Sequence, residues 1–472
     1  MEGCPARLVR TALDALAVIH EELWDEACSL VRLAPGVTPG VDLSDLDLHS
    51  VRESALGAYF DFSRGHTQRA TAALRAVLAT QWRQPDAAWS GSFPVVREQA
   101  LPALVGAREW VDYDPNWRQF LGVILAILRA KFSELLDFDL SDEVDEAISW
   151  CVAGEPDARI ADTYTNPNLL SAWLSAHEGV RGGRSTWVES GLNRAQRIME
   201  RLRHFGDVDE YNSPTYDGID LLAVALWIAY PPTQEFFEWG HELRTILRDR
   251  ISNLFHPELA VTAGPYARAY GVTFASYVSL LGIWIAVSGG ESTLPSVLTR
   301  DTEHVHDLYF GPVIVDLARE SQWTFVSQPV RLARSHTQRF GAARSTSRLS
   351  PNAAIGVDEK NRGTFARDQY VPVMVTSRGE DSSVGSLGIY LGGESYIDGY
   401  VVVDGLIEVV LRGNENGTAM RVRAEPLSID GDVVTSGPIS FELPEGDVEH
   451  VSGGFTWRGG LSETRFYLRY RP

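Results

Sequence analysis

Lysine is nearly absent from the sequence, where Lys131 and Lys360 are its only two examples. The chain has 63 acidic residues against 42 lysines and arginines, and its formal net charge at pH 7 is −21. General nucleic-acid binding depends on clustered lysine and arginine side chains that replace the counterions of the phosphate backbone. This composition therefore argues against a nucleic-acid partner, whereas a local arginine cluster can still bind an anionic substrate.

Cysteine and long apolar runs are also scarce. The three cysteines, Cys4, Cys28 and Cys151, lack the spacing of a metal site, and we expect them to be structural, with a catalytic thiol as the alternative. No segment has about 18 uncharged apolar residues in a row. The first residues lack the apolar run and cleavage site of a signal peptide. These absences predict a cytoplasmic protein with no membrane contact.

The familiar cofactor and hydrolase motifs are missing as well. There is no P-loop, no GxGxxG after a strand, no GxSxG and no HExxH. The EHVHD stretch (303–307) would place His304 and His306 on one face if extended, with Glu303 and Asp307 adjacent, as in some metal sites. No third distant ligand accompanies them, so we expect neither a metal nor another cofactor.

The chain of 472 residues is too long for one ordinary hydrophobic core and predicts two domains. Up to about residue 290 the apolar pattern is helical. Segments that are apolar on nearly every face, such as 120–136 and 221–230, alternate with amphipathic ones, such as 184–205 and 233–255. Fully buried helices are therefore expected to alternate with helices exposed on one side.

Proline marks the predicted start of four buried helices. These prolines, at intervals of 52, 47 and 51 residues, are Pro115, Pro167, Pro214 and Pro265. Three of them follow good N-cap residues, which are Asp114, Asn166 and Ser213. A repeat of about 50 residues with two helices per unit is typical of helical-hairpin arrays. Six such hairpins would close an (α/α)6-type toroid over residues 1–300, with an open superhelix as the alternative.

The pattern changes to strands in the last part of the chain. Short runs rich in β-formers, such as 371–377, 399–413 and 463–470, lie between turn sequences. They predict an antiparallel β-sandwich domain over 371–472, so the fold class is mainly α plus β. Residues 301–370 are expected to connect the two domains.

Equivalent helix starts of a toroid lie at the same end of the ring, so the segments around the four prolines should converge on one mouth. Their candidate binding or catalytic side chains are Tyr113, Asn116, Trp117, Tyr164, Asn166, Asn168, Glu210, Tyr211, Asn212, Tyr216, Asp217, Tyr266, Arg268 and Tyr270. Aromatic faces stack on sugar rings and amides bind hydroxyl groups. The mouth therefore predicts a site for an oligosaccharide or another small molecule.

The EYNSPTYDGID stretch (210–220) is the most specific of these segments. It places carboxylates, an amide and two phenols around a helix N-terminus, where backbone N–H groups and the helix dipole favour an anion. This pattern indicates proton abstraction or neutralisation of a carboxylate, with a Ser-Pro cap that holds neighbouring loops as the alternative. Glu210, Asp217 and Asp220 could instead include the acid and base of an inverting glycosidase.

Arg268 is the only arginine among these candidates. Tyr266 and Tyr270 would share a face with each other if a helix has begun there. Arg268 would then be a cationic anchor beside a phenolic acid or base, and the alternative is an arginine paired with Glu210 or Asp217.

The layout of a helical toroid, a β-sandwich and a mouth with Asn, Tyr, His and Arg resembles the toroid polysaccharide lyases, including the alginate lyase and heparinase II/III-like groups. In those lyases an Asn or Arg neutralises a uronate carboxylate while a Tyr or His moves the proton. The resemblance implies that Asn212 and Arg268 neutralise the carboxylate. It also implies that Tyr216 or Tyr270 transfers the proton, with His256 as an alternative base or a structural residue.

Three kinds of function stay open at this point. The first is lyase-type β-elimination on a uronate-containing saccharide. The second is another toroid enzyme, either an inverting glycosidase or an isomerase, dehydratase or cyclase that acts on a small hydrophobic metabolite. The third is a non-catalytic glycan-binding or scaffold protein. The sequence does not predict the oligomeric state.

Overall fold

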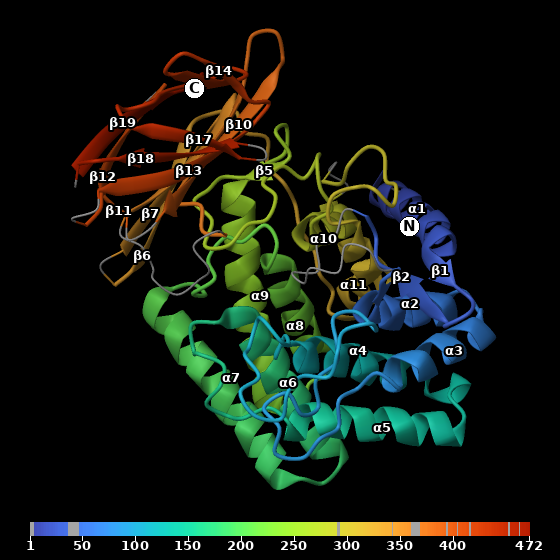
Figure 1. The fold of residues 1–472 in the computed structure, drawn as a ribbon. Helices are drawn as coiled ribbons and strands as arrows, with labels where there is room; N and C mark the ends of the chain where they lie inside the picture. The colour runs from blue at the N-terminus through green and yellow to red at the C-terminus, as the bar shows by residue number, and fades with distance from the viewer. Residues whose placement is uncertain are drawn as a thin grey trace.

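The computed structural model has a helical part and a β-rich part (Figure 1). The residues it describes are 4–35, 47–289, 293–341, 343–359, 369–392, 395–403, 405–414, 417–451, 454–461 and 463–472. No helix among them is long and apolar enough to cross a membrane.

The helices occupy the first two thirds of the chain. They are α1 (Cys4–Leu23), α2 (Val51–Ser63), α3 (Thr67–Leu78), α4 (Trp117–Phe132), α5 (Phe138–Ala153), α6 (Thr165–Arg181), α7 (Ser185–Phe205), α8 (Asp217–Ala229), α9 (Gln234–Leu254), α10 (Leu280–Gly289) and α11 (Gly311–Glu320). Two 3-10 helices are η1 (Ser133–Leu135) and η2 (Val305–Phe310). Five short strands lie between the helices: β1 (Trp24–Asp25), β2 (Leu30–Arg32), β3 (His49–Ser50), β4 (Phe255–His256) and β5 (Val261–Thr262).

The helices form a closed ring. The inner helices α2, α4, α6 and α8 pack side by side in this order, and each forms a hairpin with the outer helix that follows it. α11 packs against both α8 and α2, which closes the ring, and α10 packs against α8 and α1. The predicted toroid is confirmed and the open superhelix is excluded. Its four regular hairpins are completed by α1, α10 and α11.

The inner and outer helices differ in burial as their apolar patterns predict. Every residue of α8 from Asp217 to Ile228 is buried, because neighbouring helices cover all of its faces. The outer helix α7 buries Ala195, Ile198 and Leu202 on one side and exposes its charged side. Apolar side chains from the inner helices form one continuous core within the ring.

Three of the four predicted helix starts agree with the structure. α4, α6 and α8 begin within three residues of Pro115, Pro167 and Pro214. The Ser213 hydroxyl accepts the Tyr216 N–H at 3.0 Å, as expected of a capping residue. Two of the proposed caps differ. Asp114 accepts the N–H of Asn116 instead, and Asn166 lies inside α6.

No helix begins at Pro265, although residues 263–279 are all described. They form an irregular segment, and α10 begins only at Leu280. Tyr266 and Val371 exchange two backbone hydrogen bonds of 3.0 Å, which hold this segment extended against the sandwich. Tyr266 and Tyr270 consequently share no helical face. Tyr266 is fully buried, whereas Tyr270 is 37% exposed.

Two antiparallel sheets form the C-terminal sandwich. The larger sheet has the order β17-β18-β13-β10-β9-β8-β7-β6. Its strands are β6 (Arg334–Phe340), β7 (Ala343–Ser350), β8 (Ala353–Glu359), β9 (Val373–Arg378), β10 (Val384–Gly392), β13 (Thr418–Glu425), β17 (Asp447–Val451) and β18 (Gly454–Gly459). The smaller sheet has the order β11-β12-β19-β16-β15-β14. Its strands are β11 (Tyr396–Val403), β12 (Leu406–Arg412), β14 (Ser428–Asp430), β15 (Val433–Ser436), β16 (Ile439–Glu442) and β19 (Glu463–Arg469).

The stretch 301–370, expected to be a connection, contains parts of both domains. α11 belongs to the ring, where Val313 and Leu317 join the helical core. β6, β7 and β8 belong to the larger sheet, where Ile355 and Val357 join the core of the sandwich. Apolar burial therefore extends each domain into this stretch.

The larger sheet packs directly on the irregular segment of the ring. The Gly356 backbone lies so close to Gly264 that a Cβ at Gly356 would be 1.7 Å from the Gly264 carbonyl carbon. Tyr266, Met374 and Tyr390 form an apolar cluster in this contact. The sandwich thereby fixes the segment that carries Arg268 and Tyr270.

Candidate functional site

A cavity of about 610 Å³ lies at the mouth of the ring, where the first turns of α2, α4 and α8 meet the irregular segment. The predicted mouth residues that line it are Asn116, Trp117, Tyr164, Tyr216, Arg268 and Tyr270. Further lining residues, outside that prediction, include Arg52, Trp110, Asp114, Thr215, Glu303, His304, His306, Asp307 and Gln369. The cavity therefore combines aromatic surfaces with acids, bases and two arginines.

Arg268 holds one wall of the cavity together. It donates to Glu210 Oε1 at 2.9 Å, to the Tyr216 hydroxyl at 2.8 Å and to Gln369 Oε1 at 2.8 Å. Glu210 is fully buried, and its Oε2 also accepts the backbone N–H and the Nδ2 of Asn166, at 2.9 and 2.7 Å. Arg268 thus pairs with the buried Glu210, as one of the two alternatives predicts, and it also lies beside the Tyr216 phenol.

Tyr216 and Tyr270 continue this wall toward His304. Their hydroxyl oxygens are 2.9 Å apart, and Gln369 Nε2 donates to the Tyr270 hydroxyl at 3.2 Å. The Tyr270 ring stacks on the His304 ring with the centroids 5.2 Å apart. Arg268, Tyr216, Tyr270 and His304 therefore form one continuous series of contacts along the cavity.

Burial shifts the proton equilibria of two groups on this wall. It raises the pKa of Tyr216 well above its usual range, although the Arg268 charge opposes this shift. Burial also lowers the pKa of His304 to about 4, and the Arg52 charge adds to this effect. Near neutral pH the phenol keeps its proton and the imidazole is neutral, so a proton donor and a proton acceptor lie on one wall.

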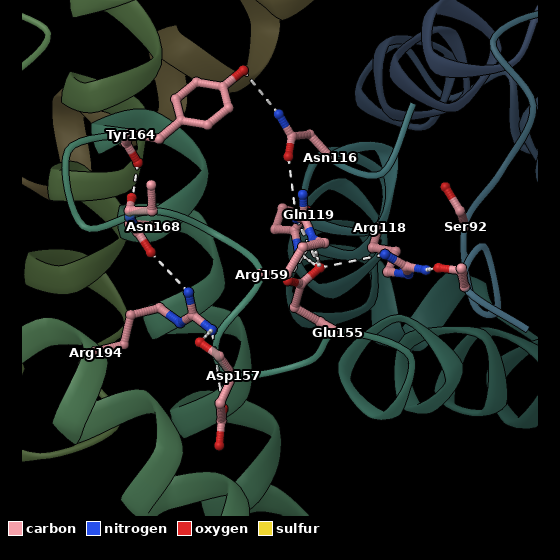
Figure 2. A network of polar contacts seen from close by, with 12 residues as sticks. Ser92, Asn116, Arg118, Gln119, Glu155, Asp157, Arg159, Tyr164, Asn168 and Arg194 are labelled. Carbon is pink, nitrogen blue, oxygen red and sulfur yellow. Dashed lines mark hydrogen bonds and ion pairs between the residues drawn. The ribbon is translucent and has the colours of Figure 1, made fainter. Parts of the chain in front are cut away.

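Asn116 and Tyr164 are positioned by a polar network at the starts of α4 and α6 (Figure 2). Asn116 Nδ2 donates to the Tyr164 hydroxyl at 3.0 Å, and Arg159 donates to Asn116 Oδ1 at 3.2 Å. Both oxygens of Glu155 accept hydrogen bonds from Arg159 in turn. Burial raises the pKa of Tyr164 to about 12, so its hydroxyl is neutral. This network presents an amide and a phenol to the cavity in fixed orientations.

Arg52 brings a second positive charge to the cavity from the first turn of α2. Its Cζ lies 5.7 Å from the Trp117 ring centroid and 5.6 Å from that of Phe310, and its guanidinium pairs with the buried Glu53. Burial raises the pKa of Asp307 to about 7, and the Arg52 charge opposes this shift. A guanidinium packed among aromatic rings is well suited to bind a carboxylate.

His304, His306 and Asp307 form the one histidine-rich group at this cavity that has metal-ligand character. One ligand atom from each lies within 4.8 Å of the others, and His306 Nε2 is 3.3 Å from Asp307 Oδ1. The two histidines meet at the turn into η2, where His304 has a left-handed φ of 57°, and not along an extended strand. Burial and then the Arg52 charge lower the pKa of both histidines. Because the same charge opposes a bound cation, the group suits proton transfer better than metal binding.

A comparison with protein families matches the part of the chain that builds this cavity. The family described as "Domain of unknown function (DUF8769)" matches residues 45–319, which is more than half of the 472 residues. The chain belongs to the DUF8769 family. The match runs from α2 into α11, and Gln369 is the one lining residue of the cavity outside it. The comparison with curated proteins gives no significant match.

Several solved structures are distantly similar to this DUF8769 chain. A chondroitin AC lyase of Streptomyces coelicolor A3, in complex with chondroitin sulphate, has 10% identity and a TM-score of 0.43 over 100% of this chain and 80% of that chain. The endoglucanase CelQ of Clostridium thermocellum, with cellotriose, has 9% identity and a TM-score of 0.32 over 90% and 84%. An alpha-L-rhamnosidase of Dictyoglumus thermophilum has 11% identity and a TM-score of 0.28 over 90% and 46%. All three are carbohydrate-active enzymes, but a similarity this low does not decide the reaction of the DUF8769 chain.

Asn212 of the DUF8769 chain does not reach the cavity. Its Nδ2 donates to the carbonyl oxygens of Ala263 and Pro265, at 2.7 and 2.9 Å, and the residue is 1% exposed. Both amide protons are therefore used to hold the irregular segment. The role that the lyase resemblance implies for Asn212, neutralising a substrate carboxylate, does not fit this geometry.

Asp217 and Glu210 are also buried beneath the cavity. Asp217 Oδ1 lies 2.8 Å from Arg250 Nη2, and burial raises the pKa of Asp217 to about 7 despite that charge. Glu210 is engaged by Arg268 and Asn166. Asp220, the third acid of that prediction, is fully buried in α8. None of the three carboxylates lines the cavity, so they do not fit the acid and base of a glycosidase.

His256 lies on the far side of the irregular segment, in contact with the sandwich. Its Nε2 is 2.9 Å from the Ser350 carbonyl oxygen, it is fully buried, and burial lowers its pKa. The structural alternative for His256 is therefore the one that fits. Tyr266 likewise donates its hydroxyl proton to the Thr262 carbonyl oxygen within the buried contact.

The other predicted mouth residues support the cavity from behind. Tyr113 packs with Trp82 and Trp89, and the Tyr211 ring lies 5.3 Å from the Arg250 guanidinium carbon. Asn168 donates to the carbonyl oxygens of Ala161 and Tyr164, at 2.7 and 2.9 Å, and accepts from Arg194 at 2.7 Å (Figure 2). These contacts explain why polar groups cluster there without facing a ligand.

Arg52, His304 and Gln369 are the main lining residues that the proline repeat does not predict at the mouth. The proline pattern overlooks Arg52 because α2 begins without a proline, directly after β3. An arginine in the first turn of an otherwise buried helix is a signal that could have identified it. Gln369 comes from the stretch beside the sandwich, 101 residues after the Arg268 side chain that it contacts, and no local pattern indicates that contact.

Proposed function

We propose that this chain is a carbohydrate-active enzyme that cleaves a uronate-containing saccharide by β-elimination in the cavity of the ring. The observation that carries the proposal is the continuous wall of Arg268, Tyr216, Tyr270 and His304. This wall combines a protonated phenol with a neutral imidazole near neutral pH.

The elimination needs one base and one acid, and the wall supplies both. His304 takes the proton from C5 of the uronate, and the electrons of that C–H bond form a double bond between C4 and C5. The C4–O bond breaks, and Tyr216 gives its proton to the leaving oxygen. The His304 imidazolium then returns its proton to the Tyr216 phenolate, which restores both groups. Over the full cycle one proton moves from C5 to the leaving oxygen, so the reaction needs no co-reactant.

Arg52 is the group we assign to the uronate carboxylate, in place of Asn212. Charge on the carboxylate makes the C5 proton hard to remove, and a guanidinium bound to it stabilises the charge that develops. Trp110, Trp117 and Tyr164 give the cavity aromatic faces for a sugar ring. Asn116 adds an amide for hydroxyl groups.

The test is an assay of the purified protein with galacturonan, alginate and hyaluronan oligosaccharides. Elimination produces a conjugated double bond, which absorbs in the ultraviolet, together with one new reducing end per cleavage. We expect both signals in equal amounts, and we expect the Tyr216→Phe variant to lose both. Tyr467→Phe is the matched control, because Tyr467 is an exposed phenol on β19. The proposal is wrong if no oligosaccharide yields the ultraviolet signal.

Hydrolysis is a second candidate, favoured by two carboxyl groups of raised pKa in the same cavity. Burial raises the pKa of Asp114 to about 6, against the Asn116 N–H and the Arg159 charge, and it raises the pKa of Asp307 to about 7. A carboxyl group with a raised pKa can act as the general acid of a glycosidase. New reducing ends without an ultraviolet signal would favour this candidate over elimination.

A further inference from the structure

A second cavity, of about 460 Å³, lies where the ring meets the larger sheet of the sandwich. Tyr270 and Glu303 line both cavities, so the second one adjoins the site described above. Its other walls come from residues 271–276 of the irregular segment and from β9, β10 and β13. The two cavities therefore meet at Tyr270 and Glu303.

Two arginines of β13 face this second cavity. Arg421 and Arg423 are two residues apart on the strand, so their side chains lie on the same face. The alternate residues, Met420 and Val422, point the other way and are buried in the sandwich core. Both arginines are half-buried, and the Arg423 guanidinium carbon lies 5.2 Å from the Tyr390 ring centroid. An arginine supported by an aromatic ring keeps its N–H groups oriented for a ligand.

The opposing residue on β10 leaves room for that ligand. Gly388 pairs in register with Arg423 and lines the cavity. A Cβ at Gly388 would already lie 3.3 Å from Val371 and 3.4 Å from Met374, so a larger side chain would crowd the cavity floor. The sheet is therefore open at the point where the arginines face the cavity.

The charges around the cavity favour an anion over a cation. Glu303 and Glu425 also line the cavity. Burial raises the pKa of Glu303, which makes this carboxyl group harder to ionise. The Glu425 charge adds to this shift and the Arg423 charge opposes it. The Arg423 guanidinium lies against the Tyr390 ring, and its charge also acts on Glu303. Arg421 and Arg423 place two guanidinium groups on one face of β13, next to the cavity, where their charge attracts an anion despite the net charge of −21.

We infer that the second cavity is an anion-binding subsite for another acidic sugar unit, so the substrate is an acidic oligosaccharide that spans the ring and the sandwich. Arg421 and Arg423 would bind a carboxylate or a sulfate of that unit, and Tyr390 would support Arg423. This inference rests on the proposed function, because that function is the reason to expect a saccharide as the ligand. It adds that an acidic saccharide too short to reach both cavities is bound more weakly than a longer one.

Binding is measured by calorimetry with the full-length protein carrying Tyr216→Phe, which prevents turnover during the titration. The probes are hyaluronan, tetragalacturonate and chondroitin sulfate tetrasaccharides, a digalacturonate, and neutral cellotetraose. We expect the double substitution Arg421→Gln and Arg423→Gln to weaken binding of at least one acidic tetrasaccharide by about 10-fold to 100-fold, because charge-assisted hydrogen bonds are lost. Binding of digalacturonate should stay unchanged.

The matched control is Arg465→Gln on β19 of the smaller sheet, where the arginine is exposed and pairs with Glu408. It should bind every probe as the parent does, and melting curves should be alike for all variants. Loss confined to chondroitin sulfate would identify sulfate as the anion, and loss with tetragalacturonate would identify carboxylate. The inference is overturned if no acidic tetrasaccharide binds the parent, or if the arginine substitutions leave all tetrasaccharide affinities unchanged.

The binding experiment and the elimination assay can fail separately. Arginine-dependent binding without an unsaturated product would retain the subsite and remove the proposed reaction. An unsaturated product formed equally well by the arginine variant, with unchanged affinity, would retain the reaction and remove the subsite.

Discussion

The Arg268 guanidinium contacts Tyr216 in two ways at once. Its Nη2 donates to the Tyr216 hydroxyl at 2.8 Å, and its Cζ lies 3.8 Å from the centroid of the same ring. The hydrogen bond uses a lone pair of the hydroxyl oxygen, so the phenol proton stays free to be donated to another group. The stacked guanidinium also stabilises the phenolate that remains after that donation.

Replacing Tyr216 by Phe should remove the acid of the proposed reaction while the fold is kept. General acid catalysis contributes about 100-fold to 10,000-fold to the rate, so we expect kcat to fall by that factor. The melting temperature should change little, because the ring still packs under Arg268 and only the hydroxyl is lost. An unchanged kcat in the presence of Tyr216→Phe would exclude this tyrosine as the acid.

Replacing Arg268 by Met should destabilise the protein, whatever its function. Glu210 is fully buried, and removing one partner of a buried ion pair typically costs about 3–5 kcal/mol of the free energy of unfolding. Adding Glu210→Gln should restore part of this loss, because the charge is then removed as well. Chemical denaturation gives the free energy of unfolding of the unmodified protein, of Arg268→Met and of the double variant.

The matched control for this prediction is Arg201→Met. Arg201 pairs with Asp209 through two hydrogen bonds of 2.8 and 2.7 Å, but the arginine side chain is 32% exposed. We expect the control to lose about 1 kcal/mol or less. If Arg268→Met and Arg201→Met lose the same free energy of unfolding, the buried ion pair contributes no more to stability than the exposed one.

His304 should set the acid limit of the proposed reaction. Its pKa is lowered to about 4, so kcat/KM, which reports the free enzyme, should stay level down to about pH 5 and fall below it as the imidazole takes a proton. His304→Asn should lower kcat/KM by about 100-fold or more and remove this acid limb. Asn is chosen because it tolerates the left-handed backbone of this position.

The control for His304 is His450→Asn, at an exposed position of β17. Its pH profile should match that of the unmodified protein. An acid limb of the same position and depth in His304→Asn would assign the limb to another group, and circular dichroism at each pH excludes unfolding as its cause.

Asp307 should make the protein less stable as the pH rises toward neutral. Because burial raises its pKa from 3.8 to about 7, the neutral carboxyl stabilises the fold fully below about pH 4, and this contribution is lost as the pH rises through about 7. Asp307→Asn keeps a neutral side chain at every pH. Relative to the unmodified protein it should therefore gain stability between pH 4 and pH 7.5, by up to about 4 kcal/mol at 1.36 kcal/mol per pKa unit.

Asp301→Asn is the control, since Asp301 is exposed and close in sequence. Asp301→Asn should change the free energy of unfolding by the same amount at pH 4 and at pH 7.5. If Asp307→Asn behaves in the same way, the carboxyl group is already ionised at low pH and the assignment is wrong.

Local patterns were sufficient to predict the ring and the class of the second domain. The apolar segments 120–136 and 221–230 lie on α4 and α8, because helical burial repeats every three to four residues along the chain. The strand run 463–470 corresponds to β19, because burial of every second residue is a pattern that is also visible in the sequence. The helix start predicted at Pro265 is wrong, because Val371, more than a hundred residues later, pairs with Tyr266 and holds the segment extended.

The sequence by itself determined that the chain forms a helical toroid and a β-sandwich, and it placed Tyr216, Arg268 and Tyr270 near one mouth. Only the tertiary structure decided which polar side chains line the cavity and which are used to hold loops. Asn212 and Arg268 look equivalent in the sequence, yet one binds two buried carbonyl groups and the other reaches the cavity. Periodicity depends on neighbours a few residues away, whereas burial, pairing and pKa depend on side chains brought close from distant parts of the chain.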